Sequence, residues 1–139
     1  MNSNKQMWLN LPVKNLNKSI DFFTKLGFKF DPQLTDQNST CMIVGEDSFV
    51  MLLAEEFFKT FTKKEIADAT KSTEIIVAIQ VDSREKVNEM VNKAFSVGGK
   101  PSNEPYDHGW MYGWSFQDLE GHLWEVFYMN PDKINQDKK

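Results

Sequence analysis

LNLPVKNLNKSIDFFTKLGF, which spans residues 9–28, contains a strand, a helix and a stop in succession. Residues 8–13 predict a strand in which alternation puts the aliphatic side chains of Leu9, Leu11 and Val13 on one face. Trp8, Asn10 and Pro12 lie on the other face. Apolar side chains then recur at helical spacing over residues 16–26, so we expect an amphipathic helix there. Gly27 follows at the position where a glycine commonly ends a helix.

The residues that follow this opening favour short strands. Residues 28–30 begin an extended segment, and two apolar stretches, residues 40–44 and 49–53, flank the turn-forming residues 45–48. This pattern is typical of a β-hairpin. Residues 54–73 mix phenylalanines with many charged side chains and favour one or two short helices that link this half of the chain to the next.

The same order of elements recurs in the second half of the chain. Residues 75–81 have the pattern of an apolar strand, and Asp82 with Glu85 three residues later is typical of a helix start with Asp82 as N-cap. The helical pattern ends at the glycine pair of residues 98–99. An extended segment is expected from there to about Pro105, followed by strands at residues 111–117 and 122–129. This repetition predicts two βαβββ modules.

The composition limits where in the cell the protein is expected and which kinds of molecule it can bind. A net charge of −4 and a pI near 5.2 argue against nucleic-acid binding, because phosphate contacts require a basic surface. The single cysteine, Cys41, has no partner for an intrachain disulfide. No signal-peptide pattern follows Met1, and no apolar stretch approaches the roughly 20 residues of a membrane helix. We therefore expect a cytoplasmic protein.

Two stretches of the chain resemble the ends of a known domain. Residues 9–28 are similar to the opening of the vicinal-oxygen-chelate superfamily (glyoxalases, bleomycin-resistance proteins and dioxygenases), and residues 116–131, FQDLEGHLWEVFYMNP, to its closing hairpin. The resemblance implies an α+β fold in which two βαβββ modules form cupped mixed sheets around a cavity. It implies a single domain with modules at about residues 5–53 and 74–130, joined by the helical linker at 54–73, and often a homodimer.

The resemblance also implies four positions for the ligands of a divalent metal ion, on the first and last strands of each module. They fall on Trp8, on Ile76 in the repeat, on Met51 or Leu52, and on Glu125. Such ions prefer oxygen and nitrogen ligands, which indole, alkyl and thioether side chains do not supply. Because Glu125 alone matches the family pattern, we predict that the usual metal site is lost and that no cofactor is bound.

The candidate catalytic residue is Glu125, since a carboxylate flanked by apolar residues can act as a general base or as a recognition group. Residues 106–114 are rich in aromatic side chains, and tryptophan offers stacking and cation–π contacts to a flat or cationic ligand. The predicted ligand-binding residues are Trp8, Asn10, Tyr112, Trp114 and Phe127. As an alternative, Trp8 fills the former metal site, and Tyr112 and Trp114 pack in the core or at a dimer interface.

These patterns favour a protein that binds a small organic ligand in an aromatic cavity without a tightly held metal, as the drug-sequestering members of the superfamily do. A glyoxalase-type enzyme, similar to lactoylglutathione lyase, is the first alternative, with metal-free catalysis through Glu125 or a relocated metal site. A relocated site would combine Glu125 with residues drawn from Glu104, Asp107, His108 and His122. A structural dimer with a filled cavity is the second alternative.

Overall fold

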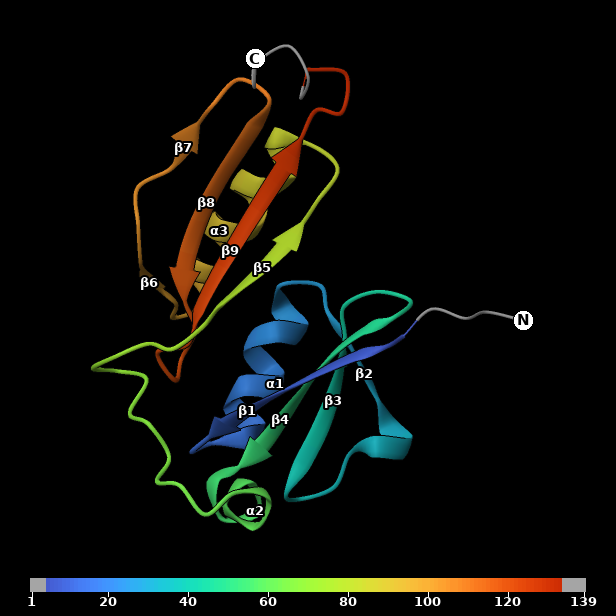
Figure 1. The fold of residues 1–139 in the computed structure, drawn as a ribbon, viewed down its shortest axis with the longest axis vertical. Helices are drawn as coiled ribbons and strands as arrows, with labels where there is room; N and C mark the ends of the chain where they lie inside the picture. The colour runs from blue at the N-terminus through green and yellow to red at the C-terminus, as the bar shows by residue number, and fades with distance from the viewer. Residues whose placement is uncertain (1–4, 134–139) are drawn as a thin grey trace. The chain divides into compact units, whose positions relative to one another are not determined.

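Each half of the chain carries one mixed sheet and one longer helix (Figure 1). The computed structural model describes residues 5–133, and the chain divides into two units, Met1–Ala67 and Asp68–Lys139. Each unit has the order strand, helix, strands, so the predictions of an α+β fold and of two βαβββ modules are confirmed. Within residues 5–133, no helix is both long enough and apolar enough to cross a bilayer.

The first unit is built on a four-stranded sheet in the order β1-β4-β3-β2. β1 and β4 run parallel, whereas β3 pairs antiparallel with both β4 and β2. The elements in chain order are β1 (Met7–Val13), α1 (Leu16–Lys25), β2 (Lys29–Asp31), the 3₁₀ turn η1 (Pro32–Leu34), β3 (Ser39–Ile43), β4 (Ser48–Ala54), α2 (Glu55–Phe58) and the 3₁₀ turn η2 (Lys59–Phe61).

The ends of α1 follow from the local sequence. The Asn15 side chain accepts a hydrogen bond from the backbone N–H of Lys18 at 3.1 Å, which satisfies one of the free donors of the first turn. Gly27 has a φ of 102°, a conformation that favours glycine, so the helix stops where the sequence predicts. The side chains buried between α1 and one face of the sheet include Leu11, Val13, Phe22, Phe23, Val50 and Leu52.

The segment predicted to be a helical linker is helical only in its first part. α2 and η2 end at Phe61, and residues 62–75 form turns and irregular backbone. α2 packs against β1 and β4. The helical part of this segment therefore belongs to the first unit.

The second unit has a five-stranded sheet in the order β5-β9-β8-β6, and β7 also pairs with β8. β5 and β9 run parallel, and the remaining pairs are antiparallel. β6 and β7 together form the edge beyond β8. The elements are β5 (Ile76–Gln80), α3 (Arg84–Ser96), β6 (Lys100–Pro101), β7 (Tyr106–Asp107), β8 (Met111–Gln117) and β9 (Leu123–Met129).

The start of α3 corrects the predicted N-cap. Ser83, and not Asp82, caps the helix, because the Ser83 hydroxyl accepts a hydrogen bond from the backbone N–H of Lys86 at 3.1 Å. The Asp82 carboxylate instead lies 3.2 Å from the Lys86 ammonium at the surface. Serine and aspartate are nearly equivalent as caps, so the backbone conformation at residue 83, which is extended, decides between them.

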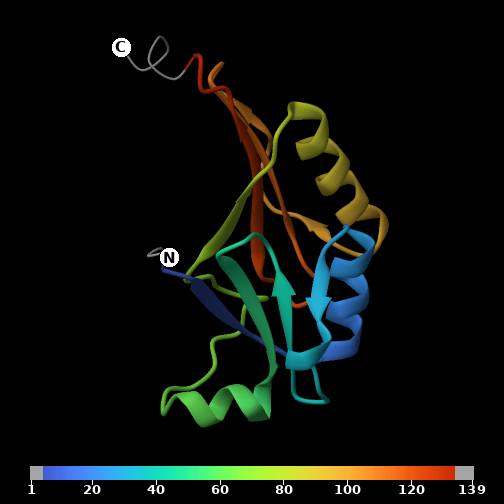
Figure 2. The same cartoon turned by 90° about the vertical axis from the view of Figure 1, so that its right-hand side faces the viewer.

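α3 covers one face of the second sheet, and no helix in residues 68–133 covers the other (Figure 2). Side chains alternate between the two faces along β8 and β9. The buried side chains between α3 and the sheet include Val87, Val91, Ala94, Phe116, Trp124 and Val126. The face without a helix, here called the open face, carries Ala78, Gly113, Ser115, Glu125 and Phe127, which lie across from one another in the strand register.

A buried carboxylate fastens the hairpin between β8 and β9. Asp118 Oδ1 accepts hydrogen bonds from the backbone N–H groups of Glu120 and His122 at 2.8 and 3.0 Å. Its Oδ2 accepts one from the Trp124 indole at 2.9 Å. Burial raises the pKa of Asp118 above its ordinary value, because the charged form is poorly solvated there. The hairpin thus depends on a carboxylate that is satisfied by three donors.

Candidate functional site

Glu125 lies on β9, in the open face of the second sheet. Its neighbours across the strands are Ala78 on β5 and Ser115 on β8. Glu125 Oε1 accepts a hydrogen bond from the Tyr106 hydroxyl at 2.8 Å. Among residues 5–133, no lysine, arginine or histidine forms an ion pair with this carboxylate. A half-buried carboxylate is therefore held by a neutral donor.

The position of Tyr106 depends on a glycine in the neighbouring strand. Tyr106 on β7 lies across from Gly113 on β8, and a Cβ atom added to Gly113 would overlap the phenol. The missing side chain lets the phenol cross β8 and reach Glu125 on β9. Burial, together with the hydrogen bond to Glu125, raises the pKa of Tyr106 well above its ordinary value, so the hydroxyl keeps its proton and donates.

The next residue, Asp107, reaches the opposite face of the sheet. Arg84 of α3 donates two hydrogen bonds to its carboxylate, at 2.7 and 3.0 Å, and these bonds lower the pKa of Asp107 from 3.8 to about 2. The guanidinium carbon of Arg84 also lies 5.0 Å from the centre of the Tyr112 ring. We name this arrangement the β7 clip. On one face of the sheet Tyr106 donates a hydrogen bond to Glu125, and on the other Asp107 accepts two hydrogen bonds from Arg84.

Tyr112 and Trp114 lie on the face of β8 that α3 covers. The Tyr112 hydroxyl donates to the side chain of Asn88 at 2.6 Å. Trp114 packs edge-on against Phe95 of α3, with 5.6 Å between the ring centres. Alternation along β8 thus places these two predicted ligand-binding residues on the face opposite Glu125, where they pack against the helix.

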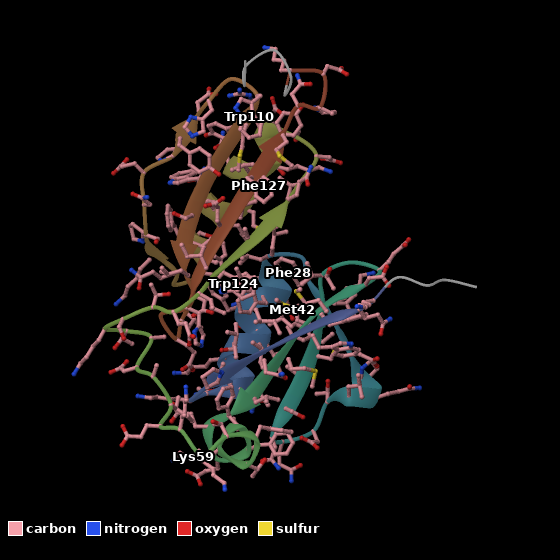
Figure 3. The ribbon with its side chains drawn as sticks, viewed as in Figure 1. Phe28, Met42, Lys59, Trp110, Trp124 and Phe127 are labelled. Carbon is pink, nitrogen blue, oxygen red and sulfur yellow. The ribbon has the colours of Figure 1, made fainter. Side chains whose placement is uncertain are left out.

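Phe127, labelled in Figure 3, lies on β9 two residues after Glu125. Strand alternation therefore places both side chains on the open face. Phe127 lies across from Gly113 and Gln80 in the register. Trp124, labelled in the same view, is fully buried on the helix face, where it stacks on Phe116. β9 thus presents a carboxylate and an aromatic ring on one face of the sheet.

Trp8 and Asn10 belong to the first unit, on the face of β1 opposite α1. Trp8 stacks on Phe49 of β4, with ring centres 4.2 Å apart, and remains 42% exposed. Asn10 lies across from Met51 in the parallel pair of β1 and β4. Trp8 therefore retains exposed surface beside its stacking contact with Phe49.

The amino-acid sequence of this chain matches the model of one protein family. The model of the Glyoxalase/Bleomycin resistance protein/Dioxygenase superfamily matches residues 5–126. The chain belongs to this superfamily. A search of curated protein sequences found no significant match.

Several solved structures share the fold of this chain. A hypothetical protein from S. aureus is 29% identical, with a TM-score of 0.76 over 91% of this chain and 95% of that one. A glyoxalase/bleomycin resistance protein/dioxygenase family enzyme from Burkholderia phytofirmans is 15% identical, with a TM-score of 0.75 over 91% and 100%. The fosfomycin resistance protein FosX from Listeria monocytogenes, crystallised with manganese(II) and sulfate, is 18% identical, with a TM-score of 0.69 over the whole of both chains.

The positions that the superfamily resemblance assigns to metal ligands do not fit a divalent ion here. Trp8 and Ile76 hold equivalent places in the parallel pairs β1/β4 and β5/β9, and this equivalence sets Glu125 against Met51 and not Leu52. Indole, alkyl and thioether groups are poor ligands for such an ion. Within residues 5–133, no three His, Cys, Asp or Glu side chains lie close enough together to hold a metal.

The relocated metal site does not form among the described residues either. Its candidate ligands besides Glu125 are Glu104, Asp107, His108 and His122. Asp107 is engaged by Arg84 on the other face of the sheet. The His108 ring packs 5.2 Å from the ring of Tyr106.

Cys41 is buried in β3, and burial raises the pKa of its thiol, which suits a packing role.

The sequence allows Glu125 to be proposed as a site residue but does not indicate Tyr106 as its hydrogen-bond partner. A glycine in the middle of a strand signals the close approach of another group, and Gly113 has this position in β8. The approaching group is the phenol of Tyr106, from the strand next to β8. Unbroken alternation from Gly113 would place Tyr106 on the opposite face, because the two residues are an odd number of positions apart; the antiparallel register of β7 and β8 is what puts Tyr106 on the face of Glu125.

Proposed function

We propose that this chain binds a small organic ligand on the open face of its second sheet, through Glu125 and Phe127, without a resident metal ion. The observation that carries the proposal is the hydrogen bond between the Tyr106 hydroxyl and Glu125 Oε1. Of the four positions that the superfamily resemblance assigns to a metal, Glu125 is the one with a suitable ligand, and its carboxylate is already engaged.

The surroundings of Glu125 support a binding role. Ala78, Leu123 and Phe127 give this face apolar surface, and an aromatic ring offers a large contact area at small entropic cost. A few polar groups in an apolar setting are typical of small-molecule sites. The superfamily contains resistance proteins that act by sequestering a drug, and we assign this chain to that mode of action. Trp8 offers a further aromatic contact surface in the first unit.

The first experiment is elemental analysis of protein purified without chelator, before and after incubation with nickel, zinc or manganese. We expect less than roughly a tenth of an equivalent of tightly held metal per chain, because a single carboxylate completed by water molecules binds a divalent ion weakly. One tightly held ion per chain would overturn the metal-free proposal.

The second experiment is a screen of small aromatic compounds by ¹H–¹⁵N NMR. Binding to the open face shifts the amide signals of β8 and β9. Glu125→Gln and Phe127→Ala should each weaken binding by about tenfold, the loss of one good contact. Glu89→Gln makes the same chemical change on an exposed position of α3 and should leave the affinity unchanged. If no compound binds the open face, the proposal fails.

A metal-free enzyme is the second candidate function, favoured by the same hydrogen bond. A carboxylate held in one orientation is suited to proton abstraction from a bound carbonyl compound. In this case Glu125→Gln would abolish turnover of a glutathione hemithioacetal while leaving its binding intact, and added metal would not raise the rate. Turnover that survives Glu125→Gln would remove this candidate.

We further propose that the protein acts as a cytoplasmic homodimer. Cys41 is buried and unpaired with another cysteine, which suits a reducing compartment. Several large apolar side chains are exposed on the strands at the edges of the two sheets, as in Ile76 and Trp8. A second copy of the chain would cover such surface.

A further inference from the structure

Tyr106 occupies one of the two carboxylate oxygens of Glu125. Its hydroxyl donates to Oε1 at 2.8 Å. Within residues 5–133, Oε2 accepts no hydrogen bond from the protein. A free carboxylate accepts a pair of parallel hydrogen bonds from a planar donor such as a guanidinium, whereas a carboxylate with one oxygen occupied presents a single strong acceptor.

The β7 clip holds Tyr106 in this position. Its backbone pairs with Gly113, and any side chain at position 113 would displace the phenol. The following residue, Asp107, is fixed by two hydrogen bonds from Arg84. A ligand that needs both oxygens of Glu125 would therefore have to displace a side chain that is anchored on two sides.

The charge on Glu125 is not neutralised within the second unit. No lysine, arginine or histidine among the described residues pairs with it. Its neighbours on the open face are the small or apolar side chains of Ala78, Ser115 and Phe127. A carboxylate on an apolar surface favours a cationic partner, and the ring of Phe127 adds a surface on which a cation is also stabilised.

We propose that Tyr106 determines the ligand specificity of this site by leaving Glu125 a single free carboxylate oxygen. This arrangement favours a ligand with a primary ammonium group on an aromatic or aliphatic scaffold. It disfavours ligands with amidinium or guanidinium groups. This inference rests on the proposed binding function and names the class of ligand. Tyr106 acts through Glu125 and is a positioning residue. The ammonium donates one charge-assisted hydrogen bond to Oε2, while Tyr106 keeps Oε1.

The test compares three probes of similar size, benzylamine, benzamidine and benzyl alcohol, by ¹H–¹⁵N NMR titration of the full chain. In the wild-type protein, benzylamine should bind about tenfold more tightly than benzyl alcohol, the difference between a charge-assisted and a neutral hydrogen bond. Benzamidine should bind no more tightly than benzylamine. In Tyr106→Phe both oxygens become available, so the affinity ratio of benzamidine to benzylamine should rise about fivefold to tenfold.

This ratio compares two cations of equal charge, so a general loss of stability does not change it. Tyr128→Phe removes a hydroxyl from the helix side of β9 and should leave the ratio at its wild-type value. Glu125→Gln retains an acceptor for Tyr106 but no charge, and should reduce the preference for benzylamine over benzyl alcohol to about one.

Two outcomes separate this inference from the function on which it rests. A ratio that stays within about twofold of wild type in Tyr106→Phe overturns the role of Tyr106 and leaves the binding function standing. If benzyl alcohol or anionic aromatic compounds bind as tightly as benzylamine and benzamidine, the preference for an ammonium group is overturned and the binding function again stands. If neither cations, neutral probes nor anions shift the amides of the open face, the inference and the proposed function fail together.

Discussion

At residue 113, one absent methyl group decides whether Tyr106 reaches Glu125. We expect Gly113→Ala to lower the free energy of unfolding by about 1–3 kcal/mol, because the added Cβ atom overlaps the phenol and forces it aside. Urea denaturation measures the loss. Gly45→Ala is the matched control, since nothing lies within 4 Å of its added Cβ atom, and it should change little. Equal stability of the two variants would show that the phenol moves freely.

Asp118 is a second residue on which the fold depends. In Asp118→Ala the Trp124 indole and two backbone N–H groups lose their acceptor, and we expect a loss of about 1–3 kcal/mol or more, the cost of leaving buried donors unsatisfied. Asp82→Ala removes a carboxylate whose side chain is 76% exposed and should cost less than about 0.5 kcal/mol. Thermal and urea unfolding compare the two. Similar losses would contradict a special role for the Asp118 hairpin.

At the scale of elements, hydrophobic periodicity was sufficient to predict the longer strands and both longer helices, because one face of each is buried. Finer features were not predictable. Two adjacent cap-forming residues, Asp82 and Ser83, competed for the start of α3, and the backbone conformation selected Ser83. The edge strand beyond β8 is split into β6 and β7, and strands of two residues leave no periodic pattern.

The β7 clip should give the stability of the second unit a dependence on acid. The pKa of Asp107 is lowered to about 2 in the fold, so the Arg84–Asp107 interaction contributes fully above pH 3.8 and is lost as the pH falls toward 2. The wild type should therefore be more stable than Asp107→Asn at pH 5 to 7, and the two should converge near pH 2. Unfolding curves measured across this range provide the test. A difference that does not change with pH would assign the effect to packing and not to charge.

At the scale of the whole molecule, the candidate site could be predicted only in part. Glu125 could be proposed from the sequence because the resemblance to the closing hairpin covers a contiguous stretch, residues 116–131. Which face each aromatic side chain takes depends on strand register, and this dependence explains why Tyr112 and Trp114 were grouped with Glu125 while Tyr106 was missed. A side chain that crosses a neighbouring strand leaves no signal in its own segment.

The oligomeric state is the prediction that belongs to the molecule as a whole. β1 and β5 are edge strands of their sheets, and they carry the exposed apolar side chains of Met7, Trp8 and Ile76, with Ile76 58% exposed. Apolar edge strands attract further chains unless they are covered. We expect light scattering after size exclusion to give twice the chain mass of 16.1 kDa.

Ile76→Lys places a charge on the β5 edge and should weaken the dimer by more than about tenfold, since a buried lysine without a partner is costly. Leu34→Lys is the control, because Leu34 is also an exposed apolar residue, at 42%, but lies in the turn η1 and not on an edge strand. A wild-type protein that keeps the mass of one chain at micromolar concentration would reject the dimer. The ligand would then have to be held by the surfaces of a single chain, with Glu125 and Phe127 still its expected contacts.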